Sequence, residues 1–146
     1  MKIIKNIAIV LILIFSSCNN NKLQKTPIDK FIGTWELKGR KMTNGIQIKI
    51  HKNKKGDLIG KVVKLNNNKY VKYFVDINDI LISKISRKSN YEFKITERKI
   101  ASELFGYYGI NTSDKFIAQF IGNDTIGLGK GNSDPQKSNI FYIRIK

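Results

Sequence analysis

Residues 46–51 read Ile-Gln-Ile-Lys-Ile-His, and this strict alternation of apolar and polar side chains decides the fold class. Because successive side chains of a β-strand point to opposite faces of the sheet, a period of two predicts a strand with one buried and one wet face. The same period recurs over residues 91–96, 116–121 and 141–146. No segment beyond residue 30 has a sustained helical period, so these runs predict an all-β domain.

Further short apolar runs bring the expected number of strands to about ten. They occupy residues 31–38, 58–65, 69–75, 80–86, 100–108 and 125–129. Clusters of Asn, Asp, Gly and Ser separate neighbouring runs, and such short connections favour an antiparallel meander. Closing the meander removes the exposed edges of the sheet. We therefore expect residues 31–146 to form one domain, an antiparallel meander that closes into a barrel of about 8–10 strands.

The first residues predict export from the cytoplasm. Lys2 and Lys5 precede an apolar run over residues 7–15, which ends in Ser-Ser-Cys at residues 16–18. This is the layout of a secretory signal. Nine apolar residues make a helix of roughly 14 Å, about half of a hydrocarbon core, which is too short for a transmembrane span. We expect residues 1–17 to be a signal peptide that is removed.

The end of this segment resembles the signal of bacterial lipoproteins. That resemblance implies that the chain is cleaved before Cys18, its only cysteine, and that Cys18 carries lipid, with acyl chains such as palmitate. Residues 18–30 are then the lipidated cysteine and a polar, flexible tether. The resemblance also implies the outer membrane, because Asn19 stands where Asp would retain the protein at the inner membrane. We expect a domain facing the periplasm, with the cell surface as the alternative location; the alternative for Cys18 is an ordinary buried thiol.

The chain is strongly basic, with a formal net charge of +16. Its densest positive stretch is His-Lys-Asn-Lys-Lys-Gly-Asp at residues 51–57, a turn between two apolar runs that projects Lys52, Lys54 and Lys55 from a hairpin tip. Each lysine near an anionic lipid surface contributes on the order of 1 kcal/mol, so the tip is a candidate contact with membrane phosphates. The alternative is three ordinary solvated lysines. The export signal argues against nucleic acid as the partner of these charges.

Residues 31–37, Phe-Ile-Gly-Thr-Trp-Glu-Leu, resemble the first strand of lipocalin-like (calycin-type) barrels, whose Gly-x-Trp motif corresponds here to Gly33 and Trp35. Arg144 in the last run resembles the basic residue that covers this tryptophan in the family, a contact of about 1 kcal/mol. Arg144 falls on the face opposite the apolar side chains of its own run, which requires a bulge or a position at the barrel rim. The resemblance implies a small lipophilic ligand such as a fatty acid, although the fold also serves proteins with nothing bound in the lumen.

Two lysines and four phenylalanines are candidates for contact with such a ligand. Over residues 58–65 either strand register places one lysine among apolar neighbours, Lys61 or Lys64, and an inward lysine suits a carboxylate or phosphate group. The alternative is a lysine whose stem lies at the rim and whose charge reaches solvent. The phenylalanines, as pocket lining or alternatively as core, are Phe93, Phe105, Phe116 and Phe120.

The sequence carries no catalytic signature. His51 is the only histidine, so no second histidine exists for a zinc site or a facial triad. The carboxylates lack a signature spacing, and there is neither a phosphate-binding loop nor a nucleophile elbow. We expect no enzyme activity, metal or cofactor. The expected function is a membrane-anchored carrier or sensor of a small lipophilic molecule, and the alternative is an envelope interaction module with a filled barrel and a protein or anionic partner.

Overall fold

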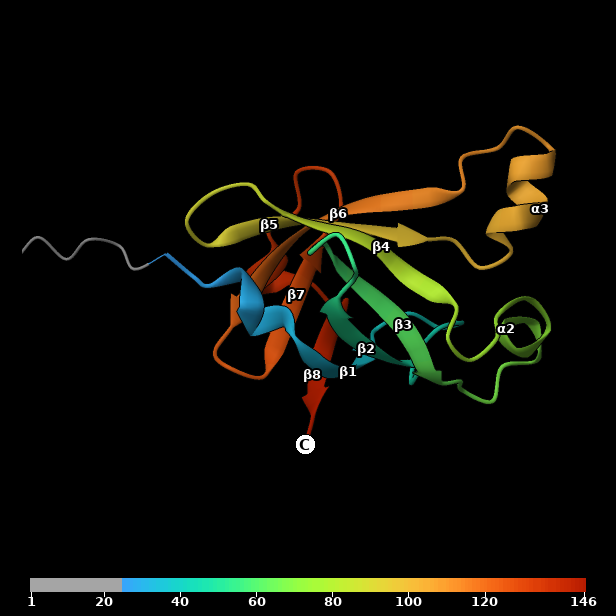
Figure 1. The fold of residues 1–146 in the computed structure, drawn as a ribbon, viewed down its shortest axis with the longest axis horizontal. Coiled ribbons are helices and arrows are strands. Elements are labelled where there is room, and N and C mark those ends of the chain that lie inside the picture. Colours follow the sequence, from blue (N-terminus) through green and yellow to red (C-terminus); the bar gives the residue numbers. More distant parts are fainter. Residues whose placement is uncertain (1–24) are drawn as a thin grey trace, which may run out of the picture.

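The structure is a computed structural model that describes residues 25–146, so Cys18 and the predicted signal peptide lie outside the described residues. Eight antiparallel strands follow one another along the chain, and the first pairs with the last to close a barrel (Figure 1). The prediction of an all-β antiparallel barrel is confirmed. The strands are β1 (Gly33–Lys38), β2 (Gln47–Lys52), β3 (Leu58–Lys64), β4 (Ile80–Arg87), β5 (Glu92–Arg98), β6 (Ser113–Ile121), β7 (Thr125–Gly129) and β8 (Phe141–Ile145).

Two of the expected strands are short helices instead, α2 (Lys69–Phe74) and α3 (Ser102–Tyr107). The start of α2 is fixed by Asn68, whose side chain accepts hydrogen bonds from the backbone N–H groups of Tyr70 and Val71. A cap of this kind satisfies donors that a helix otherwise leaves free, and it overrides the strand preference of the aromatic residues that follow. Among residues 25–146, no helix has the length and apolar character that crossing a membrane requires.

The interior of the barrel is filled by side chains over most of its length. The alternation in β2 turns Ile48 and Ile50 inward, and both are fully buried. Most of the corresponding inward positions of the other strands are buried as well. The fully enclosed large side chains are Phe31, Trp35, Leu37, Ile46, Ile48, Ile50, Ile82, Phe93, Ile95, Ile126, Leu128 and Tyr142.

A short 3-10 helix, η1 (Ile28–Phe31), covers one end of the barrel. The ring of Phe31 lies 4.8 Å from that of Phe93 and 4.7 Å from that of Phe120, measured between centroids. Trp35 joins this cluster by donating a 2.7 Å hydrogen bond from Nε1 to the carbonyl oxygen of Phe31. We call this the closed end. The two helices α2 and α3 lie at the other end, which we call the mouth (Figure 1).

Trp35 and Arg144 lie directly opposite each other where β1 pairs with β8. The guanidinium carbon of Arg144 is 4.1 Å from the centroid of the Trp35 ring, and its two Nη atoms donate to the carbonyl oxygens of Ile32 and Lys30. A Cβ on Gly33, which has a φ of +140°, would lie 2.5 Å from Nη1 of Arg144, so the motif glycine leaves room for this arginine.

No bulge is needed to bring Arg144 to this position. The inward face of β8 carries Tyr142 and Arg144, and Tyr142 is fully buried. The apolar side chains at positions 141, 143 and 145 lie on the other face of the strand. The sequence pattern therefore identifies a strand here but misassigns its faces, because the inward positions are amphipathic and the outward ones are apolar.

Candidate functional site

Three polar side chains meet inside the mouth of the barrel: Arg40, Glu97 and Tyr142. Glu97, on β5, is only 3% exposed. Its Oε1 accepts a 2.7 Å hydrogen bond from the Tyr142 hydroxyl, and its Oε2 accepts one of 2.5 Å from Nη1 of Arg40. A buried carboxylate is tolerated only when it is paired and hydrogen-bonded, and both of these conditions hold here.

Backbone geometry brings Arg40 to this place. β1 ends at Lys38, and Gly39 follows with a φ of +86°, a conformation that favours glycine. A Cβ on Gly39 would also lie 1.7 Å from the carbonyl oxygen of Asn139, so no other residue fits between the two segments. The chain therefore turns at Gly39 and directs Arg40 back toward Glu97.

The hydroxyl of Tyr142 remains a hydrogen-bond donor at neutral pH. Burial raises its pKa well above the usual range, and the nearby negative charge of Glu97 raises it further. The protonated hydroxyl and the Arg40 guanidinium thus face Glu97 from two sides.

Two other polar atoms at the mouth are buried and have no hydrogen-bond partner among the described residues, Nη2 of Arg40 and Oγ1 of Thr43. Both residues line a cavity of about 300 Å³. The guanidinium of Arg40 also stacks on Phe116, 4.6 Å from its centroid, which holds the group in place. The cavity is lined by Leu37, Arg40, Met42, Thr43, Leu81, Glu97, Arg98, Lys99, Ile100, Phe105 and Asp114.

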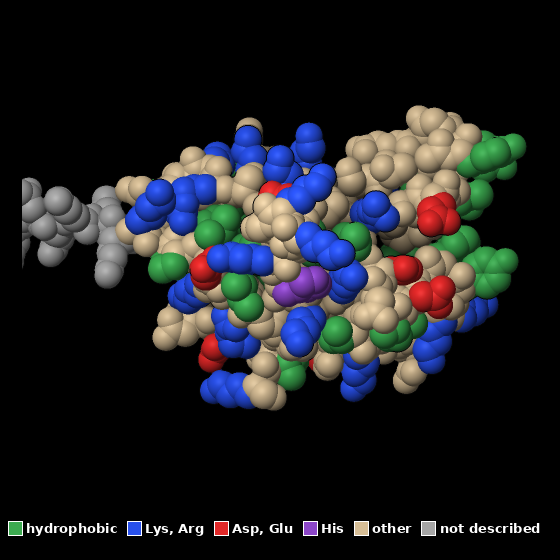
Figure 2. All heavy atoms as spheres, in the orientation of Figure 1, with side chains coloured by type: hydrophobic (Ala, Val, Ile, Leu, Met, Phe, Trp, Pro, Cys, Tyr) green, Lys and Arg blue, Asp and Glu red, His purple; other side chains and the backbone are tan. Residues whose placement is uncertain are grey.

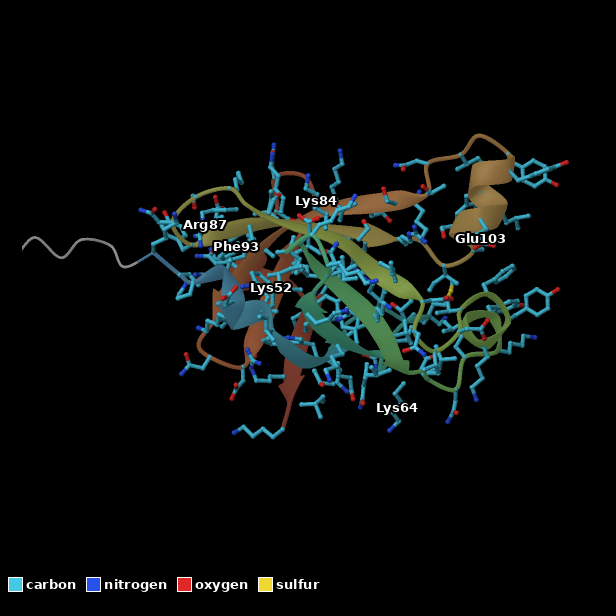
Figure 3. The ribbon with its side chains drawn as sticks, viewed as in Figure 1. Lys52, Lys64, Lys84, Arg87, Phe93 and Glu103 are labelled. Carbon is cyan, nitrogen blue, oxygen red and sulfur yellow. The ribbon has the colours of Figure 1, made fainter. Side chains whose placement is uncertain are left out.

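The four candidate phenylalanines separate into two groups. Phe105, on α3, lines the cavity, and Phe116 lies beneath the Arg40 guanidinium. Phe93 and Phe120 belong instead to the aromatic cluster of the closed end, where their ring centroids are 6.2 Å apart. Figure 3 labels Phe93 in this half of the barrel. For these last two residues the structure supports the alternative role, as core.

Neither candidate lysine points into the barrel. The inward positions of β3 are Leu58, Gly60 and Val62, which are buried, so Lys61 lies on the outer face. Lys64 is exposed at the end of the strand and extends away from the barrel (Figure 3). The prediction of an inward lysine is therefore corrected: the cation inside the barrel mouth is Arg40, from the loop after β1.

Of the predicted hairpin-tip lysines, Lys54 and Lys55 lie in the turn between β2 and β3, and Lys52 is the last residue of β2. Lys54 and Lys55 are exposed, whereas Lys52 forms a 3.0 Å ion pair with Asp29 of η1. His51 lies on the outer face of β2, with Nδ1 3.3 Å from the carbonyl oxygen of Lys49. Across residues 25–146, no cluster of three His, Cys, Asp or Glu side chains could hold a metal ion.

A second hollow, of about 320 Å³, lies between α2 and α3 beside the mouth. Its surroundings carry exposed aromatic side chains, among them Tyr73 on α2, 80% exposed, and Tyr107 on α3, 85% exposed. Figure 2 shows hydrophobic side chains protruding at this end of the molecule. The two hollows share Leu81, Arg98, Lys99 and Ile100.

Reasoning from the sequence does not identify Arg40, Thr43, Glu97 or Tyr142. One signal was present, because Glu97 falls on the same strand face as the apolar residues Phe93 and Ile95. A carboxylate that alternates in step with the buried side chains of a strand should itself be buried, and a buried charge requires a partner. The sequence does not indicate which residue is the partner of Glu97, because Arg40 lies in a loop that only the fold brings to the mouth.

Comparisons of this chain with protein families, with curated proteins and with solved structures found no match. The class of protein is therefore given by its own architecture. It is a closed, eight-stranded antiparallel β-barrel with one capped end and a small cavity at the other, lined partly by an arginine–glutamate pair.

Proposed function

We propose that the protein is a non-catalytic binding protein that takes a small, mainly apolar molecule with one anionic or hydrogen-bond-accepting group at the mouth of its barrel. The observation that carries this proposal is that Arg40 and Thr43, whose buried Nη2 and Oγ1 atoms have no hydrogen-bond partner among the described residues, line the same cavity. A buried polar group without a partner costs about 1–3 kcal/mol. A ligand oxygen that forms a hydrogen bond with either atom would recover part of that free energy.

The charges around the cavity favour a carboxylate as the ligand's polar group. Arg40, Arg98 and Lys99 line it together with two acids, Glu97 and Asp114. Asp114 is already paired with Lys130 at 2.9 Å, and Glu97 with Arg40. The remaining positive charge suits an anionic oxygen, and the volume of about 300 Å³ lies at the small end of the range for ligand pockets.

The cellular location that we propose for this function is based on the sequence. The lipoprotein-like signal supports a protein anchored through lipid on Cys18 to the outer membrane, facing the periplasm, and the barrel is compatible with the lipocalin-like superfamily suggested by Gly33, Trp35 and Arg144. Metabolic labelling with a palmitate analogue, compared between the wild type and Cys18→Ala, tests the anchor. We expect label on the wild type and none on the variant. A wild-type protein without label, or label that persists in the variant, would contradict it.

Calorimetric titration with octanoate tests the ligand site. We expect the wild type to bind, and Thr43→Val to bind about fivefold more weakly, because it removes one hydrogen bond of about 1 kcal/mol without disturbing the Arg40–Glu97 pair. Octanol should bind more weakly than octanoate. Lys94→Gln, which removes a cation from the outer face of β5, is the matched control and should bind like the wild type. Equal octanoate affinity in the wild type and Thr43→Val would contradict the site.

A second candidate function is favoured by the exposed aromatics of α2 and α3. In this alternative the protein is an interaction module whose filled barrel presents Tyr73 and Tyr107 to an envelope protein, since exposed apolar patches mark interaction sites. Crosslinking in membranes, compared between the wild type and a Tyr73→Ser/Tyr107→Ser variant, tests it. A crosslinked species that is specific to the wild type is expected, and its absence would reject this alternative.

A further inference from the structure

The three turns at the closed end of the barrel surround η1, and the chain leaves the barrel there toward its N-terminus. Lys52, next to the β2–β3 turn, forms its ion pair with Asp29 of η1. The backbone N–H of Thr26 donates a 2.9 Å hydrogen bond to the carbonyl of Asn90 in the β4–β5 turn. Lys30 donates a 2.9 Å hydrogen bond to the carbonyl of Gly122 in the β6–β7 turn. Lys25, the first described residue, thus lies at the closed end.

This end presents more basic than acidic side chains. Figure 2 shows Lys and Arg side chains at this end as well as over the rest of the visible face, and Figure 3 places Lys52 and Arg87 in this half of the molecule. Three of the acidic side chains at this end are partnered: Asp29 by Lys52, Glu92 by Lys88, and Asp124 by Arg144 and Lys146. Asp57, in the β2–β3 turn itself, is exposed and forms no ion pair with any residue of the described part of the chain. Lys54 and Lys55 are exposed and form no ion pair with any residue of the described part of the chain.

The β2–β3 turn holds these two free lysines in a defined position. Oδ1 of Asn53 accepts hydrogen bonds from the backbone N–H groups of Lys55 and Asp57, both of 2.9 Å. The N–H of Gly56 donates to the carbonyl of Asn53 at 3.0 Å. The two ammonium groups therefore project from an ordered tip, and little backbone freedom is lost when that tip contacts a surface.

We propose that the closed end of the barrel is a docking surface for an anionic lipid bilayer, so that the mouth of the barrel points away from the membrane. The position of the chain favours a bilayer as the partner. Lys25 follows Cys18 by seven positions, which span at most about 25 Å, so an anchor at Cys18 keeps this end near the lipid. The inference rests on the proposed membrane attachment and not on the ligand site.

The magnitude of the effect follows from the two free lysines. Two lysines close to an anionic surface favour the docked state on the order of 30-fold, and the opposing charge of Asp57 in the same turn reduces this to on the order of fivefold. The attraction is screened within a Debye length of about 8 Å at physiological ionic strength, so docking should weaken as salt is added. The competing orientation places the exposed aromatics of α2 and α3 on the membrane, because tyrosine also favours the membrane interface.

Acetylation footprinting of lysines by mass spectrometry distinguishes these orientations. The full chain is reconstituted into vesicles of phosphatidylcholine alone, and into vesicles of equal parts phosphatidylcholine and phosphatidylglycerol. We expect Lys54 and Lys55 to react severalfold more slowly in the anionic vesicles, and this protection to disappear in high salt. Lys94 and Lys115 on the barrel side, and Lys69 and Lys72 on α2, should react equally in both. Protection of the barrel-side lysines or of the α2 lysines, or no protection of Lys54 and Lys55, would overturn the proposal.

Two charge-reversal variants distinguish an effect of the docking surface from an effect of the protein's net charge. Lys54→Glu/Lys55→Glu and Lys94→Glu/Lys115→Glu change the net charge equally, and all four positions are exposed. Lys88, in the β4–β5 turn of the closed end, should also be protected in the wild type in anionic vesicles. We expect the first variant to abolish this protection of Lys88, and the second to leave it unchanged. Equal effects of the two variants would contradict a specific docking end. Membrane attachment itself is measured separately by flotation, so loss of anchoring is distinguished from loss of orientation.

Discussion

The hydroxyl of Tyr142 donates a 2.7 Å hydrogen bond to Oε1 of Glu97, joining the last strand of the barrel to β5 across its interior. Both residues are almost completely buried. The pair explains why a carboxylate persists among apolar side chains, and it holds Glu97 where its second oxygen can accept from Arg40. The position of the Arg40 guanidinium, and of its partnerless Nη2, depends on this arrangement.

Replacing Tyr142 by phenylalanine should destabilise the protein by about 1.5–3 kcal/mol, because a hydrogen bond to a buried charged group is lost. Urea unfolding measures this difference. Tyr91→Phe is the matched control, since Tyr91 is 48% exposed, and it should leave the unfolding free energy nearly unchanged. Equal stability of Tyr142→Phe and the wild type would show that Glu97 does not depend on this hydroxyl.

The carboxylate of Glu36 should make stability depend on pH in the acid range. Hydrogen bonds from Lys38 and Gln47 lower its pKa below the usual range. A carboxyl group with a lowered pKa contributes stability above its unfolded-state pKa, and this contribution is lost as the pH falls through the lower folded-state value. Unfolding midpoints of the wild type and Glu36→Gln should therefore differ near neutral pH and converge in acid. A difference that grew in acid would contradict the assignment.

Trp35 is the only tryptophan, so its fluorescence reports on the contact with Arg144. Arg144→Ala removes the guanidinium above the indole and the hydrogen bonds to the carbonyls of Lys30 and Ile32. We expect an altered emission spectrum and a loss of about 1 kcal/mol or more in stability. Lys146→Ala, at the exposed residue that follows the same strand, should leave the spectrum unchanged. An Arg144→Ala spectrum identical to that of the wild type would argue against the stacking.

The outer face of the barrel contains an opposed pair of like charges, Lys49 on β2 directly across from Lys61 on β3. Like charges at directly opposite positions are destabilising, so Lys61→Glu should raise the free energy of unfolding by about 0.5 kcal/mol. The gain should shrink in high salt. Thermal unfolding at two salt concentrations measures it, and a loss of stability in low salt would show that this pair is not repulsive.

Much of the fold could be predicted from the sequence because the alternation in residues 46–51 and 91–96 follows directly from a pleat with one buried face. The two helices were missed because their aromatic residues are typical of strands, and in α2 a single cap by Asn68 decides the outcome. The faces of β8 were misassigned because its inward residues are Tyr142 and Arg144.

The site could not be assembled from sequence. Arg40 and Glu97 are 57 positions apart, and Glu97 and Tyr142 are 45 apart, so only the closed barrel brings them together. The sequence directed attention to lysines of β3 because they interrupt an apolar run. The cation at the mouth is Arg40, which comes instead from a loop. The residues around it have no periodic pattern, so nothing in the sequence marks Arg40 as unusual.

The most direct test of the ligand site is a nuclear magnetic resonance titration of the protein with octanoate, observing the Arg40 side-chain N–H groups and the Thr43 methyl group. We expect saturable shifts at Arg40 and Thr43, and unchanged signals from Phe93 and Phe120 in the aromatic cluster of the closed end. Shifts confined to α2 and α3, or no saturable shift at Arg40 and Thr43, would contradict a ligand site at the mouth of the barrel.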